Sequence, residues 1–230
     1  MDKRTPGSAT YQLPRRNMLW LLAFTLIAGL LCVFFVDQPL AQWFDHPEKD
    51  ILRLRARDIT DFALGEYWFG LAALLYITCR WILPRMQLAP AALERAKNLR
   101  TWALFYFAAL CSSGLLLTAI KHIVGRERPH KTPDHDPLQF APFNTNWHWQ
   151  SMPSGHAETL FCVATSFGFL FPRYRVWFYV FAAVMSFTRV IILQHFLSDT
   201  FVGMFLGVFG AHLAWAWLAR KYQAPLPLTY

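Results

Sequence analysis

Six apolar stretches, each about 17 to 20 residues long, are the feature that most constrains how this chain can fold. An α-helix needs about 20 apolar residues to cross a bilayer, and 17 is the lower limit. The composition agrees, because 55% hydrophobic and 16% charged residues are too apolar a mixture for an ordinary soluble domain. The sequence therefore predicts an all-α polytopic membrane protein with six transmembrane helices, at residues 18–36, 67–83, 101–120, 155–171, 176–193 and 200–218.

The distribution of Lys and Arg predicts the orientation of these helices. With both termini cytoplasmic, the cytoplasmic segments carry modestly more Lys and Arg than the outer ones, as the positive-inside rule requires. The chain then has a cytoplasmic tail at 1–17, a six-helix membrane domain at 18–218 and a second cytoplasmic tail at 219–230. Two segments lie outside: an interfacial amphipathic segment at 37–66 and a long loop at 121–154.

Two other function classes are disfavoured. The net charge of +8 does not indicate nucleic-acid binding, since no basic helix or RNA-binding aromatic motif stands outside the apolar stretches. The loop histidines also have irregular spacing that matches no standard metal site, so no metal is predicted for His122, His130, His135 and His148 with Asp134 and Asp136.

Three polar clusters fall on the same membrane face in this topology. They read KHIVGRERP at 121–129, PSGH at 153–156 and TRVIILQHFLSD at 188–199. An ionisable group at mid-bilayer costs about 2.5–3.5 kcal/mol, so charges retained at such places are expected to lie near the surface or to have a function. The convergence of all three clusters on one face predicts an active site.

The first two clusters have features of an anion site. Lys121 and Arg128 would be too far apart on one unbroken helix to hold a small anion, but Gly125 permits an earlier turn between them. Ser154 and Gly155 are typical of a helix start, where free N–H groups favour an anion. Each feature also has a plain structural interpretation, as a basic residue at a span end or as an ordinary helix cap.

The third cluster adds a cation and a possible nucleophile. Arg189 offers a planar fork suited to phosphate oxygens. His195 and Asp199 are four residues apart and are predicted to share a helix face. A carboxylate there can bind one ring nitrogen and leave the other free as nucleophile or base, although a purely structural hydrogen bond is an equal alternative. With His156, the combined set is what phosphoryl transfer through histidine needs.

At these residues the sequence resembles the type-2 phosphatidic acid phosphatase superfamily. The signature of that family has three parts: K-x6-R-P, then P-S-G-H, then S-R-x5-H-x3-D. All three spacings match, and the matching residues are Lys121, Arg128 and Pro129, then Pro153, Ser154, Gly155 and His156, then Thr188, Arg189, His195 and Asp199. Thr188 departs from the family's usual Ser, but the hydroxyl is kept, so we expect little loss of activity.

The resemblance implies a membrane lipid phosphatase that works through a phosphohistidine without a metal or other cofactor. His195 would attack phosphorus and Asp199 would orient it. His156 would protonate the departing oxygen and then activate water. The phosphate-binding residues would be Lys121, Arg128, Ser154, Gly155 and Arg189. Arg126 has no place in the signature and could contact a second phosphate or lipid headgroups.

The resemblance leaves the substrate and the acceptor open. Candidates are lipid A phosphate, phosphatidylglycerol phosphate and undecaprenyl diphosphate, cleaved at the outer, periplasmic face of a bacterial inner membrane. A lipid phosphotransferase would use the same phosphohistidine with another alcohol as acceptor. A non-enzymatic anion or lipid transporter could bind its cargo with the same charges. The sequence does not indicate an oligomeric state.

Two further patterns predict how the chain meets lipid and how its helices pack. Four aromatic residues of the long loop are predicted to lie in an interfacial belt: Phe140, Phe143, Trp147 and Trp149. Gly203 and Gly207 have the small-x-x-x-small spacing that permits close helix packing.

Overall fold

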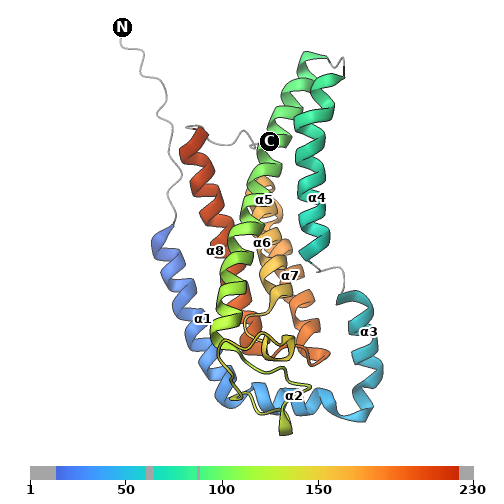
Figure 1. Ribbon diagram of the computed structural model, residues 1–230, viewed down its shortest axis with the longest axis vertical. Helices are drawn as coiled ribbons and strands as arrows, with labels where there is room; N and C mark the ends of the chain where they lie inside the picture. The colour runs from blue at the N-terminus through green and yellow to red at the C-terminus, as the bar shows by residue number, and fades with distance from the viewer. Residues whose placement is uncertain (1–13, 61–64, 87–88, 223–230) are drawn as a thin grey trace.

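The computed structural model describes residues 14–60, 65–86 and 89–222, and these residues form helices and connecting turns with no β-strand among them. Six long helices run up and down beside one another, the short helix α2 lies across one end, and the short helix α3 runs upright beside the bundle at that end (Figure 1). The all-α prediction is confirmed, and each predicted span coincides largely with one long helix. These are α1 (Arg15–Phe35), α4 (Gly65–Ile77), α5 (Pro90–Val124), α6 (Gly155–Leu170), α7 (Arg175–Ile191) and α8 (Leu197–Tyr222).

Four helical stretches are long and apolar enough to cross a membrane. They lie within Arg15–Phe35, Pro47–Arg85, Pro90–Val124 and Leu197–Lys221. The remaining two helices, α6 and α7, have 16 and 17 residues, which gives about 24–26 Å at the usual rise against a core of about 30 Å. Spanning by α6 and α7 and the orientation of the helices therefore stay predictions. Most of both predicted tails lies outside the described residues.

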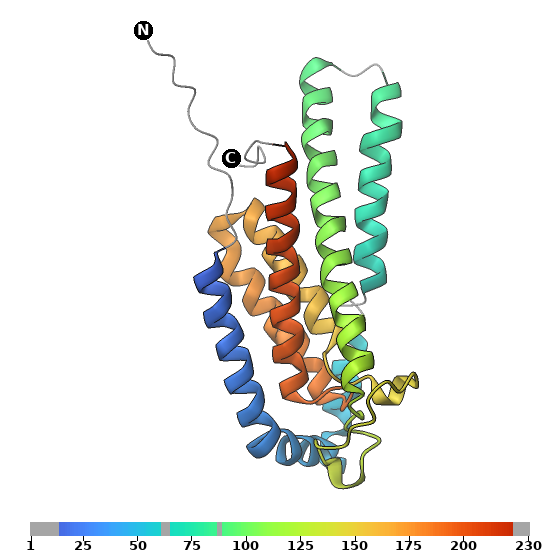
Figure 2. The ribbon, with the colours of Figure 1, turned by 60° about the vertical axis from the view of Figure 1, so that its left-hand side comes forward.

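The predicted interfacial segment forms two helices, α2 (Asp37–Asp45) and α3 (Asp50–Thr60), joined by a short 3-10 turn at Pro47–Lys49. Residues 61–64 of that segment lie outside the described part of the chain. α2 buries Ala41 and Phe44 on one face, and its buried side packs against Val190, Leu193 and Phe196. This helix thus lies directly against the turn between α7 and α8 and forms the base of the bundle (Figure 2).

The end of α5 is fixed by Gly125. Its φ is +58°, in the left-handed region that closes many helices. A Cβ at this position would lie 1.9 Å from the carbonyl oxygen of Ala141, so no residue with a side chain fits. The predicted turn between Lys121 and Arg128 is confirmed.

The close packing predicted for Gly203 and Gly207 is also confirmed. A Cβ on Gly203 would lie 2.4 Å from the carbonyl oxygen of Ser154, and one on Gly207 would lie 2.2 Å from that of Glu158. The backbones of α6 and α8 therefore touch near the starts of both helices. This contact brings the second and third polar clusters together.

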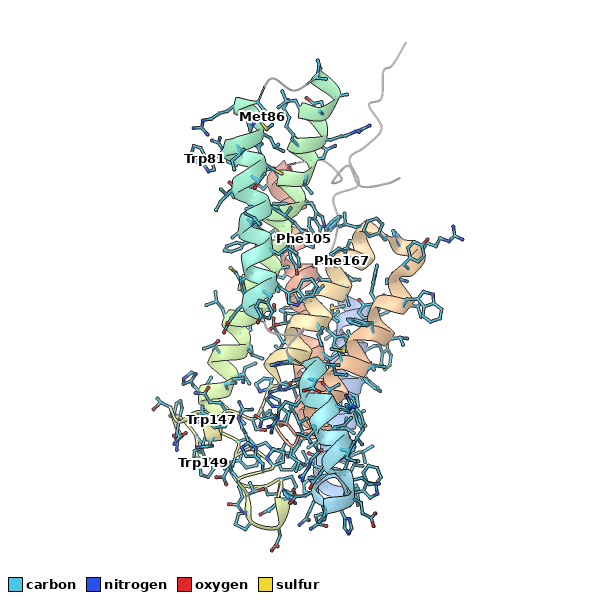
Figure 3. All side chains as sticks on the ribbon, turned by 90° about the vertical axis from the view of Figure 1, so that its right-hand side faces the viewer. Trp81, Met86, Phe105, Trp147, Trp149 and Phe167 are labelled. Carbon is cyan, nitrogen blue, oxygen red and sulfur yellow. The ribbon has the colours of Figure 1, made fainter. Side chains whose placement is uncertain are left out.

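Aromatic side chains lie at both ends of the bundle as well as in its centre (Figure 3). Trp147 and Trp149 belong to the long loop at one end, Trp81 lies at the opposite end, and Phe105 and Phe167 lie between them. Trp147 and Trp81 are each 50% exposed. Exposed Trp residues at both ends of a bundle are expected where it meets the two membrane surfaces. The interfacial belt itself stays a prediction.

Candidate active site

The three polar clusters meet at the end of the bundle that α2 crosses (Figure 2). Four different helix ends contribute predicted residues to this site. Lys121 is in the last turn of α5, Ser154 caps α6, Arg189 is in the last turn of α7 and Asp199 is in the first turn of α8. The predicted convergence of the clusters is confirmed.

Lys121 and Arg128 point at the same carbonyl group. Lys121 Nζ donates to the Gln150 oxygen at 3.0 Å, and Arg128 Nη2 reaches it at 3.5 Å. Arg128 also donates to the Trp147 carbonyl and to the side chain and carbonyl of Gln194, each at 3.1 Å. All of these partners are neutral, and no carboxylate of the described residues lies within 4.0 Å of either cation. Both positive charges are therefore left to act on an anion.

The charge of Arg128 persists at neutral pH. Burial lowers the pKa of its guanidinium to about 10, because a charged group is less stable away from water. This value is still well above 7. The indole ring of Trp147 also faces the guanidinium, with its centroid 4.9 Å from Cζ, a favourable cation–π distance.

Arg189 is held beside α3. Its Nη1 donates to the hydroxyl of Thr60 at 3.4 Å. Thr188 donates its own hydroxyl to the Met185 carbonyl at 2.6 Å and lies 3.0 Å from the hydroxyl of Thr60. The Thr that replaces the family's Ser is buried, and its hydroxyl links α7 to the end of α3. Thr188 thus holds the hydroxyl of Thr60 in place, and Thr60 in turn holds the guanidinium of Arg189.

The helix start predicted at PSGH is confirmed. The Ser154 hydroxyl accepts a hydrogen bond from the N–H of Ala157 at 3.5 Å, as an N-cap does. The N–H of Ser154 donates to the Asp199 carbonyl at 3.0 Å, which ties the second cluster to the third. A Cβ on Gly155 would meet only the Leu117 side chain, at 3.6 Å, so there is space beside the first turn of α6. That turn carries the positive end of the helix dipole.

The predicted helical pairing of His195 and Asp199 is wrong. α8 begins at Leu197, so His195 lies in the preceding turn and does not share a helix face with Asp199. Its Nδ1 is 3.8 Å from the nearer Asp199 oxygen, beyond hydrogen-bond distance. The Ser151 carbonyl is much closer, at 2.6 Å from Nδ1.

This contact determines which nitrogen of His195 is free. A carbonyl oxygen can only accept, so Nδ1 must carry the proton and Nε2 keeps its lone pair. Burial, reinforced by the cations Arg128 and Lys121, holds the pKa of His195 well below its ordinary value, although Asp199 opposes this effect. At neutral pH the imidazole is therefore neutral and has the tautomer that a nucleophile needs.

The carboxylate of Asp199 stabilises the turn that carries His195. Its Oδ2 accepts from the Ser151 hydroxyl at 2.6 Å and from the N–H of Phe196 at 2.8 Å. Ser151 is the residue whose carbonyl holds His195. The carboxylate therefore positions His195 through two neighbours, with direct contact at longer range.

Arg126 is the main residue of the site that the sequence failed to assign. Both suggested roles, a second phosphate and lipid headgroups, are wrong because its side chain is fully buried. Its guanidinium donates to Asp199 Oδ1 at 2.6 Å and to Asp37 Oδ2 at 3.0 Å. It also donates to the Ser198 hydroxyl at 2.7 Å and to the Pro137 carbonyl at 2.9 Å.

Asp37 and Ser198 complete this buried cluster. Asp37, the first residue of α2, accepts from the N–H of Ser198 at 3.1 Å and from its hydroxyl. The sequence signal for Asp37 was a carboxylate directly after an apolar span, but nothing in the pattern indicated its partner 89 residues away. We call Asp37, Arg126, Ser198 and Asp199 the buried ionic cluster.

His156 is the second predicted catalytic histidine. It is the second residue of α6, and its Nε2 is buried without a hydrogen-bond partner in the described part of the chain. A buried polar atom of this kind is uncommon and often marks a functional position. His156 thus has a nitrogen available for proton transfer at the end where the cations gather.

The loop histidines have structural partners. His130 Nδ1 pairs with the Leu193 carbonyl at 2.9 Å, and His135 Nδ1 pairs with the Pro129 carbonyl at 2.7 Å. Within residues 14–60, 65–86 and 89–222, no three His, Cys, Asp or Glu side chains are grouped as a metal site would require.

Comparisons with known proteins identify several that are similar. A family model described as the PAP2 superfamily matches residues 102–223. A lipid A 1-phosphatase of Rhizobium johnstonii is 31% identical over 210 residues, which cover 90% of this chain and 83% of that protein. A lipid A 1-phosphatase of Rhizobium etli is 34% identical over 152 residues, 63% of this chain and 66% of that one. A crystal structure of a transmembrane PAP2-type phosphatidylglycerolphosphate phosphatase from Bacillus subtilis has a similar fold, with a TM-score of 0.54, 18% identity and coverage of 90% and 95%.

Proposed function

The chain belongs to the PAP2 superfamily, and on that premise we propose that it is a membrane phosphatase that removes the 1-phosphate of lipid A through a phosphohistidine. The substrate is suggested by the names of two relatives above 30% identity. The single observation that carries the mechanism is the contact of His195 Nδ1 with the Ser151 carbonyl, which leaves Nε2 free to attack.

In the first step, His195 Nε2 forms a bond to phosphorus as the bond to the sugar oxygen breaks. His156 gives its proton to that departing oxygen. As the histidine ring becomes positively charged, the nearby carboxylate of Asp199 stabilises it, and the Ser151 carbonyl keeps the ring in place. The 3.8 Å separation is short enough for a strong electrostatic effect in a buried site.

In the second step, water attacks phosphorus and the bond to Nε2 breaks. His156, now neutral, accepts a proton from that water. The products are inorganic phosphate and the dephosphorylated lipid, and both histidines return to their starting states. A phosphotransferase would differ only at this step, where an alcohol would replace water.

The phosphate oxygens carry negative charge in both steps. Three cations would bind these oxygens, from Lys121, Arg128 and Arg189. The start of α6 would add Ser154 and the N–H of Gly155. Fixed donors aimed at developing charge lower the barrier because they need no rearrangement during the reaction. The neutral partners of Lys121 and Arg128 support this role, since their charges are not neutralised within the protein.

The proposed location is a bacterial inner membrane, with the site at the periplasmic face. Both termini would then be cytoplasmic, and α2 and α3 would lie in the outer interface. The exposed apolar residues of α3 outside the cavity described below, including Ile51, Leu52 and Ile59, support contact with lipid at that end.

Phosphate release by the detergent-purified protein tests the proposal. Wild type and His195→Ala would be incubated with lipid A, phosphatidylglycerol phosphate and undecaprenyl diphosphate, each with EDTA. We expect release from lipid A that survives EDTA and is absent in the variant. Radiolabelled phosphate that stays on wild type after an alkaline denaturing quench and is released by acid would identify the phosphohistidine. No release from any lipid would reject the phosphatase and favour a transferase or a transporter.

A further inference from the structure

A cavity of about 460 Å³ lies next to the proposed phosphate site. One wall is α3, with Asp50, Arg53, Leu54 and Arg57, and the opposite wall is formed by His130 and the turn at residues 192–194. The volume is within the range of about 300–1,000 Å³ that small-molecule sites occupy. The roles proposed above for the catalytic residues do not use it.

The cavity shares a wall with the catalytic centre. Gln194 lines the cavity and accepts two hydrogen bonds from Arg128, to its side chain and its carbonyl. His195 is the next residue along the chain. His130, one residue after the signature Pro129, is fixed by its bond to the Leu193 carbonyl. A group attached to a phosphate held by Arg128 would therefore emerge beside this cavity.

Two arginines of α3 line the cavity, and they differ in their carboxylate partners. Arg53 is neutralised, since it donates to Asp45 at 2.5 Å and also pairs with Asp50. Arg57 lies one turn further along, is exposed, and has no carboxylate within 4.0 Å among the described residues. Within the described part of the chain, no carboxylate satisfies its guanidinium.

The remaining lining supplies acceptors and an apolar patch. Asp45 and Asp50 keep free lone pairs, and their side chains are 48% and 58% exposed. His130 uses Nδ1 on a carbonyl, which leaves Nε2 as an acceptor. Burial lowers the pKa of His130, so it stays neutral. Leu54 adds an apolar surface and is 58% exposed.

Donors, acceptors and an apolar patch together suit a sugar ring. The hydroxyl groups of a sugar both donate and accept, while its C–H face is apolar. An acyl chain would leave the charged lining unsatisfied, and a glycerol headgroup would make few of these contacts. We propose that the cavity binds the sugar that carries the scissile phosphate and that Arg57 determines specificity for it. This inference rests on the proposed function and deepens it.

The test compares Arg57→Ala with Arg55→Ala. Arg55 is also exposed on α3, but it lies two residues away, about 200° around the helix, and does not line the cavity. Steady-state release of phosphate would be measured with lipid A and with phosphatidylglycerol phosphate in the same detergent. For lipid A we expect Arg57→Ala to raise KM about tenfold, as the loss of one charged hydrogen bond predicts, and Arg55→Ala to match wild type.

Leu54→Trp provides a second variant, because a larger side chain would fill part of the cavity without removing a charge. It should also raise KM for lipid A more than for phosphatidylglycerol phosphate. Equal effects of Arg57→Ala on both lipids, or an unchanged KM for lipid A, would overturn the sugar site and leave the phosphatase intact. If wild type releases phosphate from neither lipid, both proposals fall.

Discussion

Arg126 and Arg128 are two residues apart in one loop, yet their surroundings are opposite. Arg126 is fully buried and donates to the carboxylates of Asp37 and Asp199. Arg128 is held by the neutral oxygens of Trp147 and Gln194. The first arginine is neutralised within the protein and holds Asp199, whereas the second has only neutral partners, as its proposed role in binding phosphate requires.

The difference predicts separate roles for these two neighbouring arginines. Removing one member of a buried ion pair leaves an uncompensated charge away from water. Removing a cation that has only neutral partners leaves weaker contacts behind. Stability and catalysis should therefore respond differently to the two arginines.

The largest effect is expected for Arg126→Met. Two buried carboxylates would lose their shared cation, so the free energy of unfolding should fall by about 3–5 kcal/mol, and turnover should be lost with the catalytic turn. Thermal unfolding in detergent measures the first effect and phosphate release the second.

Asp37→Asn in the Arg126→Met background tests whether the buried ionic cluster acts as a unit. Removing one of the two stranded charges should restore part of the lost stability, because contacting residues have coupled effects. If the two substitutions destabilise additively, Asp37 and Arg126 do not act together and the positioning role is rejected.

Arg128→Met should have the reverse balance. Its lost hydrogen bonds to carbonyls cost about 1 kcal/mol of stability, while the loss of a fixed cation at the phosphate should lower kcat/KM by about 10²–10³-fold. Arg128→Lys keeps the charge and should recover part of the rate. Unfolding as severe as that of Arg126→Met would erase the distinction between the two arginines.

The pH dependence of kcat/KM gives a smaller but more specific effect. His195 must be neutral to attack, and its lowered pKa means that it becomes protonated only well below the ordinary value of about 6.5. The acid limb in wild type should therefore lie below pH 6.5. An acid limb at or above that value would contradict the neutral, buried histidine.

The same titration should separate the two arginines. Arg128 helps to lower the pKa of His195, so the acid limb of the residual activity in Arg128→Met should move to higher pH. A limb that does not move would show that Arg128 does not act electrostatically on His195.

Much of the site followed from the sequence because its signals are local. The spacings from Lys121 to Arg128 and from Arg189 to Asp199 predicted the family, which the family match confirms. Gly125 predicted the end of α5, and Gly203 and Gly207 predicted the contact of α6 with α8. Each of these features depends on a helix end or a turn that a few adjacent residues determine.

The features of the site that the sequence did not predict depend on contacts between residues far apart in the chain. Asp37 meets Arg126 across 89 positions, and Ser151 reaches Asp199 across 48. Because neither carries a periodic pattern or a motif, spacing could not reveal them. The error at His195 has a related cause, since a four-residue spacing looks helical whether or not the helix has started. In the structure α8 begins at Leu197, two residues after His195.

The smallest effect is expected at Thr188, where the chain departs from the family's usual Ser. Thr188→Ser keeps the hydroxyl that donates to Met185 and adjoins Thr60, so kcat/KM should stay within about twofold of wild type, since no hydrogen bond is lost.

Thr188→Val has nearly the same shape but lacks the hydroxyl. It should cost about 1 kcal/mol of stability and lower kcat/KM several-fold, because Thr60 would hold Arg189 less firmly. A loss in Thr188→Ser without a loss in Thr188→Val would assign the role to the methyl group and its packing. Like Arg126, Thr188 would act on the proposed phosphate site through a neighbour, but it carries no charge, so its effect should be smaller.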